Sequence, residues 1–245
     1  MQRSDTVLTQ VMAAFEHESH RKLHNHSIHM SFDDGTLTVA GEVPDIASKK
    51  RLLRLTQTHS EGKPLVDQLR VTANPPVRDG ELRTHVCERL AQAVDFRNCV
   101  ICARVKGQLE VLRGTMDQAG EDGSGVLEVT VEDGVVTLTG QVISLSHRRL
   151  AGVIAWWVGG CRDVVNLLEL VPAEADGDDE IIEALHLVLE TDPRLRAEQI
   201  TVNVKDHRIT LGGWVATEAE SRQAEQDAWC LDAIEGVVNR IEVRA

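Results

Sequence analysis

Apolar and polar residues alternate in three regions of the chain, and each region contains two such stretches. The first stretch of each pair has apolar residues at Ile28, Met30 and Phe32, at Leu127, Val129 and Val131, and at Ile200, Val202 and Val204. A period of two predicts strands with one buried face. Each stretch is followed by a short turn around Gly35, Gly134 or His207 and then by the second stretch, which predicts a β-hairpin.

A helical pattern follows each predicted hairpin. The expected helices cover residues 45–59, 144–158 and 217–231. Ser144 and Thr217 are typical N-cap residues for the last two. Another helix is expected before each hairpin, near residues 4–20, 80–95 and 178–191, and a short inward-facing strand closes each region, at Leu69/Val71, Leu168/Leu170 and Ile241/Val243. The predicted order is therefore α-β-β-α-β, with both helices on one face of a sheet.

The three regions repeat one sequence pattern. Residues 35–43 align with residues 134–142 and 207–215, which places Gly41, Gly140 and Gly213 in register. A constant shift relates the second copy to the third, and it also superimposes Trp156 on Trp229. Collinear copies without gaps indicate a tandem repeat.

The repeated pattern resembles the BON domain, a family named for bacterial osmotic-shock and nodulation proteins. The resemblance rests on Gly-x-Val/Ile-x-Leu-x-Gly-x-Val, a helix, and then Gly-Val-Val-Asn-x-Ile-x-Val from Gly236 to Val243. It implies an α+β fold of three tandem BON-like modules, at residues 1–73, 79–172 and 178–245. The first copy departs from the pattern at Gln57, where the other two have Trp.

The second copy contains an additional alternating segment. It runs from Ile101 to Arg113 around Lys106-Gly107 and predicts a β-hairpin inserted near residues 99–114. A truncated fourth module that has lost its second helix explains the pattern equally well. Either origin adds strands whose edge must be paired or protected.

The resemblance implies a non-catalytic binding or scaffold protein that acts through protein–protein contacts, with a role in osmotic or envelope stress. Two alternatives are a peripheral phospholipid-binding protein that uses helix 144–158 and a cytoplasmic sensor of a ligand or ion. Self-association is also expected, because modules of this size have small cores. The chain has no nucleophile elbow, phosphate loop or dinucleotide fingerprint, so neither an enzyme activity nor a cofactor is expected.

The composition narrows the class of partner. Of the 245 residues, 42% are hydrophobic and 27% charged, as in soluble globular proteins. The formal net charge is −13, which argues against a nucleic-acid partner. We expect a cytoplasmic protein, because we find no signal-peptide pattern and no run of 18 apolar residues, and because five scattered Cys do not form a disulfide framework.

Aromatic and basic residues suggest candidate binding surfaces. Helix 144–158 is expected to present Trp157 beside Arg148 and Arg149, a combination typical of a lipid interface or a protein contact. The alternative is that Trp157 fills the core beneath the inserted hairpin. Trp214 precedes the inward-facing Val215, so alternation places it on the outer face of its strand, where it is free to contact another module or subunit.

Histidines and cysteines offer two weaker candidates. His17, His20 and His24 share one helix face, which is a possible geometry for Zn²⁺ or Ni²⁺. A solvated helix end with titrating histidines is the simpler interpretation, so no metal is expected. Cys99 and Cys102 form a Cys-x-x-Cys pair that precedes a strand rather than opening a helix, which favours buried, unreactive thiols.

Overall fold

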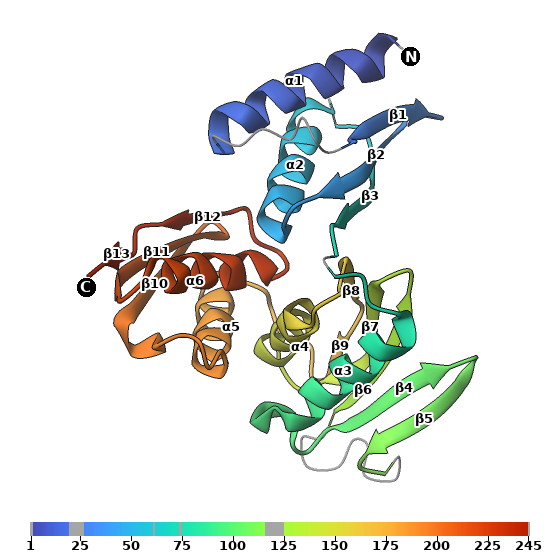
Figure 1. Cartoon of the computed structure of the whole chain (residues 1–245), viewed down its shortest axis with the longest axis vertical. Coiled ribbons are helices and arrows are strands. Elements are labelled where there is room, and N and C mark those ends of the chain that lie inside the picture. Colours follow the sequence, from blue (N-terminus) through green and yellow to red (C-terminus); the bar gives the residue numbers. More distant parts are fainter. Residues whose placement is uncertain (1, 20–26, 61, 74, 116–124, 245) are drawn as a thin grey trace. The chain divides into compact units, whose positions relative to one another are not determined.

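The structure is a computed structural model that describes residues 2–19, 27–60, 62–73, 75–115 and 125–244 (Figure 1). The chain forms two compact units, Met1–Thr72 (unit 1) and Ala73–Ala245 (unit 2). Helices and β-sheets occur in both units, so the fold class is α+β, as the sequence predicts. No helix in the described part of the chain combines the length and apolar character that crossing a membrane requires.

Unit 1 contains two helices and a three-stranded sheet. Its elements are α1 (Gln2–Ser19), β1 (His29–Asp33), β2 (Thr36–Val43), α2 (Ile46–His59) and β3 (Leu65–Val71). Strand β2 is central; it runs antiparallel to β1 and parallel to β3. Both helices cover one face of the sheet (Figure 1).

The hydrophobic core of unit 1 contains side chains from both helices and from the sheet, at helical and strand spacings. Val11 and Phe15 are one helical turn apart on α1, and Leu37 and Val39 alternate on β2. These four and Leu52 of α2 are almost completely buried in one cluster. Periods of 3.6 on the helix and two on the strand bring the apolar residues together, as their sequence pattern predicts.

The N-terminal half of unit 2 contains the largest sheet. Its elements are α3 (Asp79–Gln92), the 3₁₀ helix η1 (Val94–Phe96), β4 (Val100–Val105), β5 (Gln108–Arg113), β6 (Val126–Glu132), β7 (Val135–Val142), α4 (Leu145–Trp157), β8 (Asp163–Asn166) and β9 (Glu169–Leu170). The strand order is β5-β4-β6-β7-β8, and β9 also pairs with β7. Strands β4 and β5 form an antiparallel hairpin where the sequence predicts one, and β4 continues the sheet by pairing parallel to β6. This arrangement makes β5 an edge strand.

The C-terminal half of unit 2 repeats the topology of unit 1. Its elements are α5 (Asp178–Thr191), the 3₁₀ helix η3 (Ala197–Gln199), β10 (Ile200–Lys205), β11 (Arg208–Val215), α6 (Glu218–Cys230), β12 (Gly236–Asn239) and β13 (Glu242–Val243). Strand β11 is antiparallel to β10 and parallel to β12 and β13. The expected inward orientation of Val243 is wrong: its side chain is 39% exposed, because β13 is only two residues long and pairs only with the end of β11.

The three glycines that the sequence places in register have the same structural role. Gly41, Gly140 and Gly213 have φ angles of +137°, +117° and +91°. A Cβ atom on any of them would lie only 2.0 to 2.2 Å from a neighbouring backbone carbonyl oxygen. Both the backbone angle and the close approach require glycine at this position.

Polar side chains fix the ends of several elements. Ser144 and Thr217 accept a hydrogen bond from a backbone N–H three residues later, which confirms them as N-caps. Two aspartates in the first turn of a helix bind the backbone of a hairpin turn, a role that the sequence pattern did not predict. Asp79 accepts hydrogen bonds from the backbone of the β6–β7 turn, and Asp178 does the same for the β10–β11 turn. The N–H of His207 and the other turn contacts lower the pKa of Asp178.

Candidate functional site

Helix α4 carries three of the predicted site residues, and its burial is unusual for a helix on one face of a sheet. All residues from Arg149 to Ala155 are buried. A run of seven spans nearly two turns, so the helix is covered on all sides. One side faces the sheet of its own half, and α5 and α6 of the C-terminal half cover the other.

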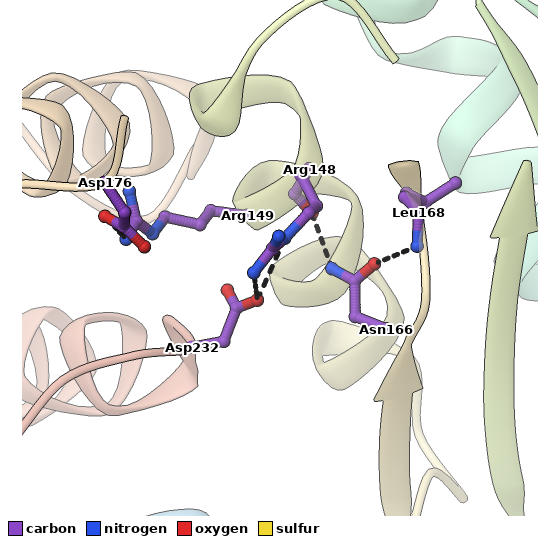
Figure 2. A network of polar contacts seen from close by, with 6 residues as sticks. All are labelled: Arg148, Arg149, Asn166, Leu168, Asp176 and Asp232. Carbon is purple, nitrogen blue, oxygen red and sulfur yellow. Dashed lines mark hydrogen bonds and ion pairs between the residues drawn. The ribbon is translucent and has the colours of Figure 1, made fainter. Parts of the chain in front are cut away.

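Two ion pairs join α4 to this C-terminal half. Arg149 is fully buried, and its Nη2 donates to Oδ1 of Asp176 at 2.7 Å. Arg148 donates through Nε and Nη2 to Oδ2 of Asp232, at 3.3 and 3.0 Å. Figure 2 shows both guanidinium groups extending from α4 toward these carboxylates. The expected solvent-facing basic patch is therefore corrected: Arg149 is buried because α5 and the segment before it lie against this side of α4.

Trp157 lies in the same contact. Its Nε1 donates to Oδ1 of Asp227 on α6 at 2.8 Å, and the guanidinium of Arg194 lies 5.9 Å from the ring centre. The side chain is half-buried. The structure thus brings Trp157, Arg148 and Arg149 together on one helix, as the sequence predicts, but places them at an intramolecular interface.

Asn166 follows two valines, as Asn239 does in the third copy, and it holds the last strand against the preceding helix. Nδ2 of Asn166 donates to the carbonyl of Arg148 at 2.7 Å, and its Oδ1 accepts from the N–H of Leu168 at 3.3 Å (Figure 2). Asn239 makes the equivalent contacts with the carbonyl of Ser221 and the N–H of Ile241. The Val-Val-Asn repeat was the signal that could have revealed this joint.

Unit 1 uses a different pair of side chains at the corresponding positions. Asp67 aligns with Asn166, and its Oδ1 accepts from the N–H of Leu69 at 2.8 Å. Its Oδ2 pairs at 2.9 Å with Nζ of Lys49, a buried lysine that also donates to the carbonyl of Leu69. The Lys49–Asp67 ion pair therefore stands where the other domains use the amide of an asparagine.

Among the exposed apolar side chains of unit 2, those on β5 and at Trp214 lie on sheets. Leu109, Val111 and Leu112 are 40%, 44% and 55% exposed on the edge strand β5. Trp214 is 39% exposed at the end of β11, where its backbone pairs with Glu242. This agrees with the outward orientation predicted for Trp214, and the two halves of unit 2 hold these surfaces on different sheets.

A cavity lies beside Trp157. It has a volume of about 500 Å³, and its lining includes Arg89, Gln92, Asp95 and Glu190 in addition to the indole ring. The side chains carry charges of both signs and form no arrangement of nucleophile and base.

Three cysteines of unit 2 have thiols whose pKa is raised by burial. Cys99 and Cys102 are buried, and burial raises the pKa of both. Burial also raises the pKa of Cys87 to about 12. These shifts favour protonated thiols at neutral pH, and the burial of Cys99 and Cys102 agrees with the prediction.

The predicted histidine cluster is only partly described. His17 is exposed on α1, and His20 and His24 lie outside the described residues. Among the residues that are described, no group of three or more His, Cys, Asp or Glu side chains is placed to hold a metal ion.

Comparisons with known proteins identify the family of the chain. Residues 100–172 and 177–245, more than half of the chain, match the family model of the BON domain. No curated protein sequence gives a significant match. Two solved structures of CdsD, a structural protein of the type III secretion system of Chlamydia trachomatis, align with the chain. The C-terminal domain has 14% identity and a TM-score of 0.25, over 96% of this chain and 98% of that one. The other structure has 13% identity and a TM-score of 0.23, over 98% and 92%.

Proposed function

Because the chain belongs to the BON domain family, we propose that it is a non-catalytic binding protein that acts through protein–protein contacts. Arg148, Arg149 and Trp157 of α4 each make an intramolecular hydrogen bond or ion pair, and the described thiols are buried or half-buried. The observation that carries the proposal is the edge strand β5 with its three exposed apolar side chains.

The geometry of β5 suits strand addition. Leu109 and Val111 lie opposite Arg104 and Cys102 of β4 and therefore project from the same face of the sheet. The guanidinium of Arg113 donates to main-chain carbonyls of the α3–η1 region, so it is turned back onto the protein. Natural proteins usually place several charges on an edge strand to prevent pairing with other chains. An exposed edge strand with apolar side chains is able to pair with a strand of another chain.

The partner that we favour is a second copy of the chain. Antiparallel pairing of β5 with its copy around a two-fold axis at Val111 places the two Val111 side chains together. The same register keeps the two Glu110 carboxylates from facing each other directly. Trp214 offers a second surface, on the C-terminal sheet, for further protein contacts.

Sedimentation velocity of the full chain at tens of micromolar tests this assembly. We expect a dimer for the native sequence and a monomer for Val111→Lys, because a charge on the edge opposes pairing. Leu167→Lys is the matched control, since Leu167 is an exposed apolar residue of the same half outside β5, and it should leave the dimer intact. A strictly monomeric native chain would contradict the assembly.

We also infer that unit 1 is a third, divergent copy of the family's module. Its sheet has the order and strand directions of the C-terminal sheet, and Gly41 has the backbone conformation of Gly140 and Gly213. The Lys49–Asp67 pair stands where the other copies have the asparagine joint. These features support the inference that all three copies share one fold with boundaries near residues 73, 79, 172 and 178.

The proposal includes a role in osmotic or envelope stress, which growth of cells lacking the protein at raised osmolarity would test. Phospholipid binding through α4 is less well supported by the geometry. Arg149 is buried, and Arg148 is paired with Asp232. The cavity beside Trp157 is the place where a small ligand would bind if the chain were a sensor, but its lining favours no particular ligand.

A further inference from the structure

Asp227 is a buried carboxyl group in the contact between α4 and α6. Its side chain has no exposed surface. Oδ1 accepts hydrogen bonds from Nε1 of Trp157 at 2.8 Å and from Nε2 of Gln223 at 2.7 Å. Oδ2, which is also buried, receives no hydrogen bond from the N–H and hydroxyl groups of the described residues. A buried charged oxygen without a donor is costly, so the ionised form of this group is poorly accommodated.

A second buried carboxyl group lies beside Asp227. Asp192, at the C-terminal end of α5, is 1% exposed, and its carboxyl is within hydrogen-bonding reach of that of Asp227. Two carboxylates only accept hydrogen bonds, so one of the pair must be protonated for a bond to form between them. When Asp227 carries the proton, its hydroxyl is able to donate to Asp192.

Arg194 determines which group is ionised. Its Nε and Nη2 donate to Oδ1 and Oδ2 of Asp192 at 2.8 and 2.7 Å. Although burial opposes ionisation of Asp192, these bonds hold its pKa below the ordinary value. Burial raises the pKa of Asp227 to about 8, and the negative charge of Asp192 adds to this effect, while the hydrogen bond from Trp157 opposes it.

The groups facing Asp227 come from each element around it. Helix α4 contributes the neutral donor Trp157, its own helix contributes the neutral donor Gln223, and the segment after α5 contributes Asp192 and Arg194. Two carboxyl groups thus share one guanidinium, which is already engaged by Asp192. Ionisation of Asp227 would leave a net negative charge inside the contact.

We propose that Asp227, Asp192, Arg194 and Trp157 form a proton-dependent latch that closes the two halves of unit 2 while Asp227 is protonated and loosens when it ionises. In the open state, Asp227 is hydrated and has an ordinary acidity. The closed state therefore binds one more proton than the open state between about pH 4 and pH 8. Raising the pH through this window shifts the equilibrium toward the open state by up to about tenfold per pH unit, and above about pH 8 no further shift is expected.

NMR of the full chain tests the latch directly. The indole N–H signal of Trp157, assigned with Trp157→Phe, should titrate with a midpoint near pH 8. The exchange of this proton with water should accelerate with pH more steeply than base catalysis alone predicts. Asp227→Asn keeps a neutral group that can accept from Trp157 and donate to Asp192. In this variant the signal should not titrate between pH 5 and pH 9.

Two further variants separate the latch from a general loss of stability. Asp232→Asn removes another carboxylate from the same contact, the partner of Arg148, and should weaken the contact without moving the midpoint. Trp157→Phe removes a donor to ionised Asp227 and should raise the midpoint, measured by the rate of proteolysis between residues 172 and 177. Proteolysis that is independent of pH in the native chain, or an indole signal that titrates unchanged in Asp227→Asn, would overturn the proposal.

Discussion

Single residues set the backbone path of this protein where two chain segments come closest. Gly140 shows this most clearly, because its φ angle of +117° and the nearby carbonyl oxygen of Val126 each exclude a side chain. The sequence pattern predicted that glycines would recur here but not the reason for it. The reason is the close approach of paired backbones, and alternation of apolar and polar residues carries no information about that distance.

Replacing Gly140 with Ala should destabilise unit 2 by about 2–3 kcal/mol, since the new Cβ collides with backbone and the residue must keep a left-handed conformation. Urea unfolding monitored by circular dichroism measures this loss. Gly159→Ala is the control, because φ is not positive there and no atom lies within 4 Å of an added Cβ. It should change stability by less than about 0.5 kcal/mol. Equal losses in the two variants would contradict the collision argument.

At the scale of elements, α4 shows where reasoning from sequence succeeds and where it ends. The expected range, residues 144–158, agrees closely with Leu145–Trp157, and the N-cap Ser144 is correct. These features depend on local signals within a few residues. The burial of Arg149 depends on Asp176 and on helices that come later in the chain, and a repeat alignment does not reveal which copies pack on each other. The sequence therefore predicted the correct helix for Arg148, Arg149 and Trp157 but not that other helices would cover it.

The paired state of Arg148 leads us to expect little or no binding to anionic liposomes at physiological salt. The pair with Asp232 would have to break, and the many carboxylates of the chain repel the same surface. Arg148→Glu should leave co-sedimentation at the level of the native chain and lower the stability of unit 2 by about 1 kcal/mol, a modest loss because both side chains are partly exposed. Strong co-sedimentation that this variant abolishes would show that α4 binds lipid.

At the scale of the whole molecule, the chain divides into two compact units of unequal size. Unit 1 is compact by itself, whereas the two halves of unit 2 share α4 and its buried contacts with α5 and α6. The sequence predicted the elements and the β4–β5 hairpin. It did not predict this division, because the packing of α4 against α5 and α6 joins helices from two different copies, and a repeat pattern does not show which copies pack together.

The shared burial of α4 predicts that residues 73–245, expressed alone, unfold in one cooperative transition. Calorimetry should give equal van't Hoff and calorimetric enthalpies, because neither half can unfold without uncovering the apolar residues of the other. Residues 1–72 provide the comparison and should unfold independently of them. Two separate transitions within residues 73–245 would show that the contact around α4 contributes little to stability.

The ion pair between Lys49 and Asp67 limits how these two positions can change. Changing Asp67 alone to the asparagine found at positions 166 and 239 would remove a carboxylate from a buried ammonium group. Changing Lys49 alone would leave the carboxylate without its counter-charge. Each single step passes through a destabilised intermediate, although both end states are well formed. Lys49 and Asp67 are therefore expected to change together during evolution.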